Sequence, residues 1–343
     1  MDLEPDRPAP GRWLQDLADL GRRSIRPAVW AYVQAGAGDA VTAAEATAAW
    51  REVRFRTRVL REAGEANLRT TLLGTEVSSP LGIAPTAMQR AVHPAGERAM
   101  AQGAGEETLH VVSSNCGTRF ADLAPPGPWW LQAYLPPQRE LFAPVMAAAV
   151  AAGARAVVLT VDTPYPGTKH GVDDEDWESI DLSWWRVNYP DADLGDWKTD
   201  LAPGDIAWLR ETAGVPVVVK GVLRGDDALR CLDAGADAVY VSNHGGRQLD
   251  RAVDTATALR EVVAAVGDRA EVYVDGGIRS GVDALAALAL GARAVFVGRP
   301  AVWALGADGS RGVDRLLGGL RAELTEALEL AGCATPGEAR DLL

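Results

Sequence analysis

One pattern of apolar and polar positions occurs twice in the second half of the chain and once, in part, earlier. Residues 227–241 and 283–297 each carry an amphipathic segment, a Gly-Ala pair and a short apolar run, and residues 153–159 repeat the end of this pattern. The glycine can close a helix in the left-handed conformation, and the β-branched run that follows is typical of a parallel strand buried on both faces. The pattern therefore predicts alternating helices and parallel strands.

Similar apolar runs occur at about eight places along the chain. They lie near residues 81–84, 109–112, 130–133, 156–161, 216–219, 238–241, 271–274 and 294–297. Eight is the number of parallel strands that closes a (β/α)8 barrel. We therefore predict an α/β fold built on a TIM barrel.

The residues before the first barrel strand predict a different structure. Residues 1–78 carry helical patterns at 13–35 and 43–53, followed by a hairpin pattern at 68–73 with Gly74 at the turn. Helical periodicity and a glycine between two short β-prone runs are the signals for these elements. We interpret the region as an N-terminal helical and hairpin cap packed on the barrel.

Residues 79–343 form the barrel in this interpretation, with one unusually long connection. The connection runs from about residue 164 to residue 202 and carries few regular signals. A connection of that length is typical of a lid or of a disordered excursion. The acidic run at 173–176 within it is interpreted as a solvated loop surface.

Polar residues stand at the end of nearly every predicted strand. Barrel enzymes build their sites where strands end and the following loops begin, so these residues predict one ligand-binding face. The residues in these positions are Thr86, Ser113, Gln132, Tyr134, Thr160, Asp162, Lys220, Ser242, His244, Arg247, Asp275, Arg279 and Arg299.

His244 and Arg247 follow one strand in a glycine-rich turn. A histidine can accept a proton near neutral pH, and an arginine can hold a carboxylate by two parallel hydrogen bonds. The pair indicates a base that works on an acid-bearing substrate. Asp162 is a candidate to orient the imidazole, and its alternative role is that of a helix N-cap.

The loops after the last two strands predict an anion site. Asp275-Gly276-Gly277 is followed by Arg279, and Gly298 precedes Arg299. Glycines let backbone N–H groups approach an anion and guanidinium groups neutralise it, and barrels commonly bind phosphate at these two loops. The alternative is a pair of tight turns with solvated arginines.

Three further candidates keep alternatives open at this stage. Lys220 is a Schiff-base lysine, a fixed cation beside an electron-accepting ring, or part of an ordinary ion pair, and its residue type does not decide among these. Tyr32 and Tyr134 either present hydroxyl groups to a substrate or are packing residues.

Composition narrows the class of protein. The chain has 343 residues and a formal net charge of −13, which argues against binding to nucleic acid or to an anionic membrane. Its three cysteines and four histidines share no metal-ligand spacing, so no metal is predicted. The longest apolar stretch is interrupted by Arg155, and the acidic N-terminus is unlike a signal peptide, so we expect a cytoplasmic protein. Walker and strand-linked G-x-G-x-x-G motifs are absent, which argues against ATP and NAD binding.

With these residues in place, the chain resembles the FMN-dependent α-hydroxy-acid oxidases and dehydrogenases, a family that includes glycolate oxidase, lactate oxidase, mandelate dehydrogenase and hydroxymandelate oxidase. The resemblance runs from about Tyr32 to Arg299 and into the last helices. It rests on Ala84-Pro85-Thr86-Ala87-Met88-Gln89, Leu159-Thr160-Val161-Asp162-Thr163-Pro164, Val219-Lys220-Gly221, residues 242–250, Asp275-Gly276-Gly277-Ile278-Arg279 and Gly298-Arg299-Pro300.

The resemblance implies that FMN is the cofactor. It places Lys220 beside the N1–C2 region of the flavin, where negative charge gathers on reduction, and so favours electrostatic stabilisation over imine chemistry. The cofactor-binding residues that it implies are Pro85, Thr86, Ala87, Ser113, Gln132, Thr160, Lys220, Ser242, Asp275, Gly277, Arg279, Gly298 and Arg299.

The resemblance also implies an activity and its catalytic residues. An (S)-2-hydroxy acid would be oxidised to the 2-oxo acid, with His244 as the base, Asp162 behind it, electrons passed to flavin N5 and reoxidation by dioxygen. Arg247 would clamp the substrate carboxylate, while Tyr32 and Tyr134 would contact its carboxylate and hydroxyl groups. Assembly as a homotetramer or octamer is implied in the same way.

Two residues depart from the family pattern. Lys169 stands where the family often has a second carboxylate-binding arginine, and lysine keeps the charge but loses the bidentate fork. Asn115 stands where glycolate-type enzymes have a tryptophan. The smaller side chain predicts an open pocket and a larger substrate than glycolate, mandelate-like or long-chain.

Three alternatives to an oxidase remain at this stage. The first is a dehydrogenase that passes electrons to a quinone or a carrier protein. The second is a non-redox barrel that acts on a phosphorylated ligand with Lys220 as nucleophile. The third is a barrel that binds its ligand without turnover.

Overall fold

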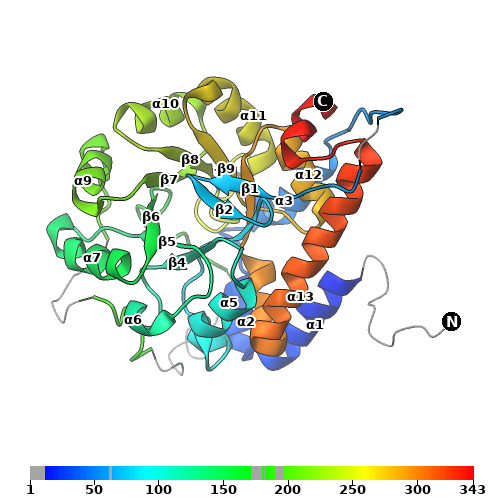
Figure 1. The fold of residues 1–343 in the computed structure, drawn as a ribbon. Helices are drawn as coiled ribbons and strands as arrows, with labels where there is room; N and C mark the ends of the chain where they lie inside the picture. Colours follow the sequence, from blue (N-terminus) through cyan, green and yellow to red (C-terminus); the bar gives the residue numbers. More distant parts are fainter. Residues whose placement is uncertain (1–11, 62–63, 171–179, 181, 190–196) are drawn as a thin grey trace.

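The computed structural model describes residues 12–61, 64–170, 180, 182–189 and 197–343, and the acidic run at 173–176 lies outside them. Eight parallel strands close into a barrel in the order β10-β3-β4-β5-β6-β7-β8-β9, which confirms the predicted TIM barrel (Figure 1). The strands are β3 (Leu81–Ile83), β4 (His110–Ser113), β5 (Trp129–Ala133), β6 (Ala154–Thr160), β7 (Val217–Val222), β8 (Ala238–Val241), β9 (Glu271–Val274) and β10 (Ala294–Val297).

The strands are buried on both faces, as their continuous apolar runs predict. Trp130, Tyr240, Tyr273 and Phe296 point into the barrel and pack their rings against one another. A Cβ atom at Gly82 would lie 2.4 Å from the ring of Phe296, so only glycine leaves room for this ring in β3. The barrel interior is thus a filled aromatic core that leaves ligand binding to one of its mouths.

Helices surround the barrel and join its strands (Figure 1). They are α5 (Gly96–Ala104), α6 (Phe120–Leu123), α7 (Ala143–Ala151), α9 (Pro203–Ala213), α10 (Gly225–Asp233), α11 (Thr255–Val266), α12 (Gly281–Ala289) and α13 (Arg299–Ala331), with the short elements α4 (Gln89–Val92), η1 (Arg139–Phe142), η2 (Gly267–Arg269) and η3 (Pro336–Leu342). The backbone of α13 leaves helical geometry at Asp308 and Gly309, where the helix kinks. Among the described residues, none of the helices has the length and apolar character that crossing a lipid bilayer requires.

The N-terminal mouth of the barrel is covered by a hairpin. Strands β1 (Thr70–Leu72) and β2 (Thr75–Val77) pair antiparallel around the turn at Gly74, as the sequence predicts. Leu72 and Val77 pack into the aromatic core of the barrel, and the backbone N–H of Leu73 donates to Glu271 at the start of β9. The hairpin therefore closes the mouth opposite to the carboxyl ends of the strands.

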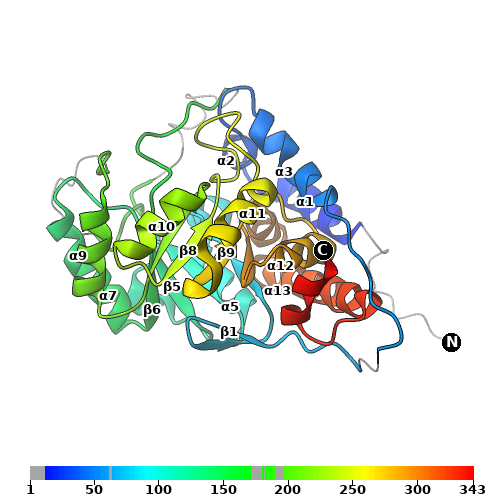
Figure 2. The ribbon, with the colours of Figure 1, turned by 90° about the horizontal axis from the view of Figure 1, so that it is seen from above.

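Three helices precede the hairpin, and they reach both sides of the barrel. α1 (Trp13–Ser24) lies along α13, whereas α2 (Pro27–Gln34) and α3 (Val41–Arg51) lie at the opposite end of the molecule from β1 (Figure 2). The prediction of one helical pattern over 13–35 is wrong, because Ile25 and Arg26 adopt extended backbone. Pro27 disfavours helical geometry in the residue before it, which ends α1 and lets α2 turn toward the carboxyl mouth.

Candidate active site

The predicted site residues gather at one mouth of the barrel. Ser113 is the last residue of β4, and Thr160 is the last residue of β6. Gln132 and Lys220 lie near the carboxyl ends of β5 and β7, and most of the other candidates lie in the segments that follow the strands. Those that follow are Pro85, Thr86, Ala87, Tyr134, Asp162, Ser242, His244, Arg247, Asp275, Gly277, Arg279, Gly298 and Arg299. The carboxyl ends of parallel strands meet at the same rim, so the imidazole and the arginines open onto the same side.

His244, which follows β8, is held by a carboxylate that follows β6, two strands away. Its Nδ1 atom lies 2.9 Å from Oδ1 of Asp162, and Thr163 donates its hydroxyl to the same carboxylate oxygen at 3.1 Å. Asp162 thereby fixes the proton of a neutral imidazole on Nδ1 and leaves the lone pair of Nε2 free to accept another. Burial would raise the pKa of Asp162, but His244 and Lys220 outweigh it, and the pKa lies below its usual range.

A glycine makes this approach possible. Gly221 has φ +108, and a Cβ atom there would lie 2.6 Å from Cβ of Asp162. Any other residue would have to displace the aspartate and adopt a left-handed backbone. His244 itself has φ +57, an uncommon value for a non-glycine residue, and its N–H donates to the hydroxyl of Ser242.

Lys220 belongs to a buried polar group with Ser242 and Asp275. Its Nζ atom donates to Oγ of Ser242 at 2.8 Å and lies 3.3 Å from Oδ2 of Asp275. Ser242 in turn donates to Oδ1 of Asp275 at 2.6 Å. A lysine nucleophile has to be neutral, whereas an ammonium group paired with a carboxylate is a fixed cation, so the geometry argues against the Schiff-base alternative.

A row of polar side chains crosses three adjacent strands at the same depth. Ser113 donates to the amide oxygen of Gln132 at 3.0 Å, and the amide nitrogen of Gln132 donates to Thr160 at 3.1 Å. Thr160 is paired in register with Lys220 on β7, so the row continues into the lysine group. These side chains are buried, and they form a polar edge suited to a planar ligand with carbonyl and N–H groups.

Three guanidinium groups form a positive cluster beside His244. In the described part of the chain, no carboxylate oxygen lies within 4.0 Å of the guanidinium nitrogens of Arg247, Arg279 or Arg299, although the backbone N–H of Arg279 donates to Asp283. Burial lowers the pKa of Arg279 to about 10, and burial, Arg247 and Arg279 together lower that of Arg299 to about 9. Burying three positive charges close together costs free energy, and such a cluster is typical of a site that binds an anion.

The N-terminus of α13 adds a second anion-binding feature to this cluster. Gly298 is the N-cap of the helix and has no side chain that could accept from the first turn. Pro300 has no N–H and Ala301 donates to the carbonyl of Gly298, which leaves the N–H of Arg299 without a partner inside the helix. A Cβ atom there would meet only Ala84 and Thr86, both at 3.9 Å, so space remains in front of the helix. The N–H of Arg299 at the positive end of the helix, beside two guanidinium groups, favours an anion. Together with the polar row and Lys220, these residues fit the phosphate-bearing flavin that the resemblance implies.

Tyr32, Tyr134 and Lys169 complete this mouth. The guanidinium group of Arg247 lies 4.6 Å from the ring centroid of Tyr32 and donates to the carbonyl oxygens of Tyr32 and Ala35 at the end of α2. Burial and the nearby Asp162 raise the pKa of Tyr134. The Lys169 ammonium donates to the Gly167 carbonyl, and burial together with Arg247 lowers its pKa to about 8.

Sequence reasoning missed residues that hold the site together. Asp250 accepts hydrogen bonds from the N–H groups of Asp39 and Thr42 and so fastens the start of α3 to the loop that carries His244. Trp303 lies beneath Arg279, with 5.2 Å between the guanidinium carbon and the ring centroid. Asp250 closes the motif that contains His244 and could have been noticed there, whereas nothing in the sequence pairs Trp303 with Arg279.

Comparisons with known proteins agree with this geometry. The family model described as FMN-dependent dehydrogenase matches residues 21–343. Among curated proteins, 2-hydroxyacid oxidase 2 of Rattus norvegicus is 35% identical over 338 residues, covering 95% of this chain and 96% of the relative. L-lactate oxidase of a Nostoc species is 36% identical and covers 94% of each chain. Among solved structures, mandelate oxidase with (S)-2-phenylpropionate is 36% identical with a TM-score of 0.90, covering 96% of this chain and 97% of the other.

Proposed function

Since the chain belongs to the FMN-dependent dehydrogenase family and acts as an FMN-dependent 2-hydroxy-acid oxidase, we propose that its site oxidises an (S)-2-hydroxy acid with His244 as the base. A mandelate-like substrate fits, because the similar structures include mandelate oxidase. The observation that carries the proposal is the partly buried His244–Asp162 pair beside three guanidinium groups that have no carboxylate partner among the described residues.

The residues at this mouth divide naturally into those that would hold the cofactor and those that would hold the substrate. The phosphate would lie between Arg279, Arg299 and the N-terminus of α13, and the polar row with Lys220 would bind the flavin edge. When bound, FMN accepts the two electrons that leave the alcohol carbon of the substrate. Lys220, as a fixed cation, favours the extra negative charge that this brings.

His244 takes the proton that the substrate loses at its reacting end. Because Asp162 holds the Nδ1 proton, Nε2 is the atom that accepts, and the imidazolium that results is stabilised by the carboxylate 2.9 Å away. The 2-hydroxy acid thus becomes a 2-oxo acid by loss of two electrons and two protons. We propose dioxygen as the final electron acceptor, since the relatives found are oxidases.

Arg247 and Lys169 would hold the substrate carboxylate. One nitrogen of Arg247 is committed to the carbonyl oxygens at the end of α2, which fixes the plane of the guanidinium group and leaves its other N–H groups for the substrate. Lys169 supplies a second positive charge without a fork, so it attracts the carboxylate but does not set its orientation. Tyr32 and Tyr134 would add hydroxyl contacts.

The test is spectroscopic. Purified holoenzyme should be yellow, and its flavin bands should bleach under anaerobic conditions when (S)-mandelate or another (S)-2-hydroxy acid is added. A yellow protein that none of glycolate, lactate, mandelate and 4-hydroxymandelate bleaches would refute the proposed activity. A colourless protein that cannot be reconstituted with FMN would refute the cofactor site.

A further inference from the structure

A stack of three side chains extends from the proposed substrate site to the loop before α9. Trp197 lies on Tyr134, with 5.0 Å between ring centroids and 29° between planes. On Trp197 lies the guanidinium group of Arg186, 4.3 Å from the ring centroid. Trp185 and Tyr189 flank the same guanidinium group at 5.4 and 5.7 Å. Arg186 is therefore one indole ring away from a residue proposed to touch substrate.

The head of this stack occupies the place that the sequence predicts to be open. Nε of Arg186 donates to Oδ1 of Asn115 at 3.2 Å. Asn115 is buried and lies two residues after Ser113, the last residue of β4. A guanidinium group can only donate, so the amide oxygen faces it and the amide nitrogen faces away. Beside Asn115 the structure therefore places a guanidinium group, where the small side chain predicts open space.

Arg186 and Asn115 offer hydrogen-bond donors. Among residues that the structure describes, no carboxylate lies within 4.0 Å of the guanidinium group of Arg186. Within the same residues, the two terminal nitrogens of Arg186 and Nδ2 of Asn115 have no hydrogen-bond acceptor. The backbone of Arg186 has φ +58, a conformation that an arginine rarely adopts. Such strain persists where the surrounding structure over-determines a residue, and it is common at binding sites.

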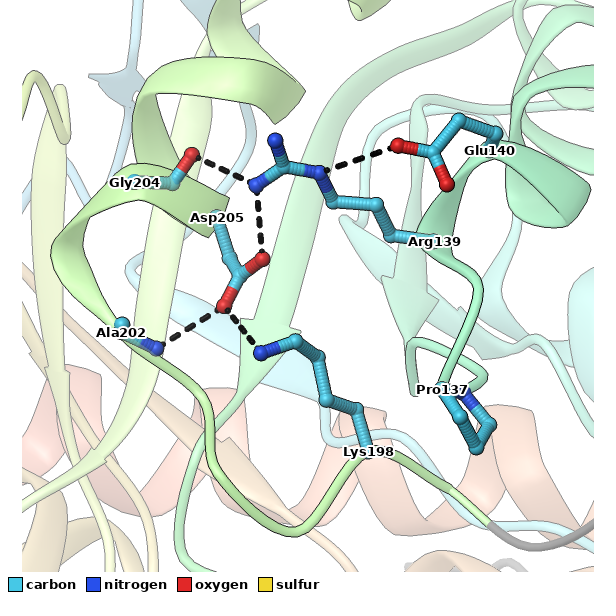
Figure 3. A pocket seen from close by; sticks show the side chains of 7 residues that line it. All are labelled: Pro137, Arg139, Glu140, Lys198, Ala202, Gly204 and Asp205. Carbon is cyan, nitrogen blue, oxygen red and sulfur yellow. Dashed lines mark hydrogen bonds and ion pairs between the residues drawn. The ribbon is translucent and has the colours of Figure 1, made fainter.

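A buried carboxylate, Asp205, binds Lys198, the residue that follows Trp197 in the chain (Figure 3). Asp205 is 2% exposed, accepts from Arg139 at 2.8 Å and lies 3.2 Å from Nζ of Lys198. The backbone N–H of Lys198 also donates to the carbonyl of Leu135 at 2.7 Å. Lys198 directly follows Trp197, so these bonds fix the indole against Tyr134. None of the residues in Figure 3 is among the predicted site residues, and their effect on the site is one of position.

We propose that Arg186 and Asn115 are specificity-determining residues that recognise an oxygen acceptor at the far end of the substrate side chain. The inference rests on the proposed function and extends it to the substrate class. The rings of Trp185 and Trp197 beside Arg186 suit a substrate with an aromatic side chain. Because the groups without a partner are all hydrogen-bond donors, they favour a substrate whose side chain ends in an oxygen that accepts hydrogen bonds. A carboxylate or a phenol oxygen meets this requirement, and the carboxylate forms the stronger, charge-assisted bond.

The experiment compares matched substrates of the holoenzyme. Anaerobic flavin reduction is measured with mandelates that carry a carboxylate, a hydroxyl or a methyl group at the para position, of which the hydroxyl and the methyl are nearly isosteric. We expect kcat/KM for the hydroxyl compound to exceed that for the methyl compound by about 10-fold or more. A further gain for the carboxylate would assign the site to an anion, and its absence would assign it to a neutral phenol.

Variants separate recognition from packing. Arg186→Met should abolish the preference while the methyl compound keeps its rate within about 3-fold, and Arg186→Lys should restore part of any carboxylate preference. Dissociation constants of the corresponding 2-oxo acids, read from flavin spectra, should change in the same order without turnover. Equal loss on all three substrates would overturn the proposal, as would a wild-type enzyme without preference.

Arg90→Met is the matched control. Arg90 lies 5.7 Å from the ring centroid of Trp184 in the same region and donates to Gly117, but it makes no hydrogen bond to Asn115. This variant should leave the preference among the three substrates unchanged, and loss of the preference here would contradict the role of Arg186. Failure of all hydroxy acids to bleach the flavin is a different result, which refutes the proposed function and the inference with it.

Discussion

The Nδ1 atom of His244 lies 2.9 Å from Oδ1 of Asp162, although 82 residues separate the two in sequence. β6 ends just before the aspartate and β8 just before the histidine, and β7 lies between them. Gly221 on β7 has no side chain, which lets Asp162 reach past it. The catalytic pair therefore depends on three consecutive strands of the barrel.

Removing either member of this pair should abolish most of the chemistry and leave the cofactor in place. We expect His244→Ala to slow anaerobic flavin reduction by about 100- to 10,000-fold, which is the usual effect of losing a general base. Asp162→Asn should slow it by at least about 100-fold, because an amide cannot stabilise the imidazolium. Stopped-flow absorbance of the flavin measures both, and near-normal reduction by either variant would contradict its assigned role.

Substrate binding should weaken as the pH rises past about 8. Burial lowers the pKa of Lys169 to about 8, so the ammonium group loses its proton there and the substrate carboxylate loses one of its two cations. KM should therefore be low below this pH and rise above it. Lys169→Arg should remove the rise, because a guanidinium group keeps its charge. A wild-type KM that stays constant between pH 6 and pH 10 would contradict the assignment.

The arginine cluster should strengthen FMN binding without stabilising the apoprotein. Arg279→Met should weaken FMN binding by about 10- to 100-fold, as expected for loss of a charge-assisted hydrogen bond, and should not lower the thermal stability of the apoprotein. FMN titration by flavin fluorescence and thermal unfolding of the apoprotein are the measurements. Inorganic phosphate should raise the melting temperature of the wild-type apoprotein, and to a smaller extent that of the variant.

Gly221→Ala should be disproportionately harmful for so small a change. The added methyl group would meet Cβ of Asp162 at 2.6 Å on a backbone with φ +108, so we expect a loss of about 1–3 kcal/mol in the free energy of unfolding. Flavin reduction should slow as well, because Asp162 is displaced from His244. Chemical denaturation and stopped-flow absorbance test the two effects.

Gly318→Ala is the control for this substitution. Gly318 lies in α13, and a Cβ atom there would meet nothing within 4 Å. Alanine in the middle of a helix is favoured over glycine by roughly 0.5–1 kcal/mol, so this variant should be at least as stable as the wild type. Equal behaviour of the two variants would show that the contact with Asp162 has no energetic effect.

The sequence predicted the barrel, and the rim at which its polar residues gather, because local patterns of residues encode both. Every predicted strand is present within a few residues, since each apolar run is buried on both faces and is followed by a polar residue at the rim. Pro27 could have indicated the break between α1 and α2, but the helical periodicity on both sides of it led to the prediction of one continuous helical pattern. The small size of Asn115 predicted an open pocket, and no pattern in the sequence indicated that Arg186 would lie beside it.

By itself the sequence determined the strand order, the rim that carries the chemistry and the residue types available there, because in a parallel barrel these follow from the alternation along the chain. The tertiary structure alone decided which side chains meet across the mouth. Asp162 is directed to His244, Lys220 to Asp275 and Arg186 to Asn115 by contacts between segments that are distant in sequence. Such contacts depend on closure of the barrel and on the paths of long connections, and no local pattern of residues encodes either of them.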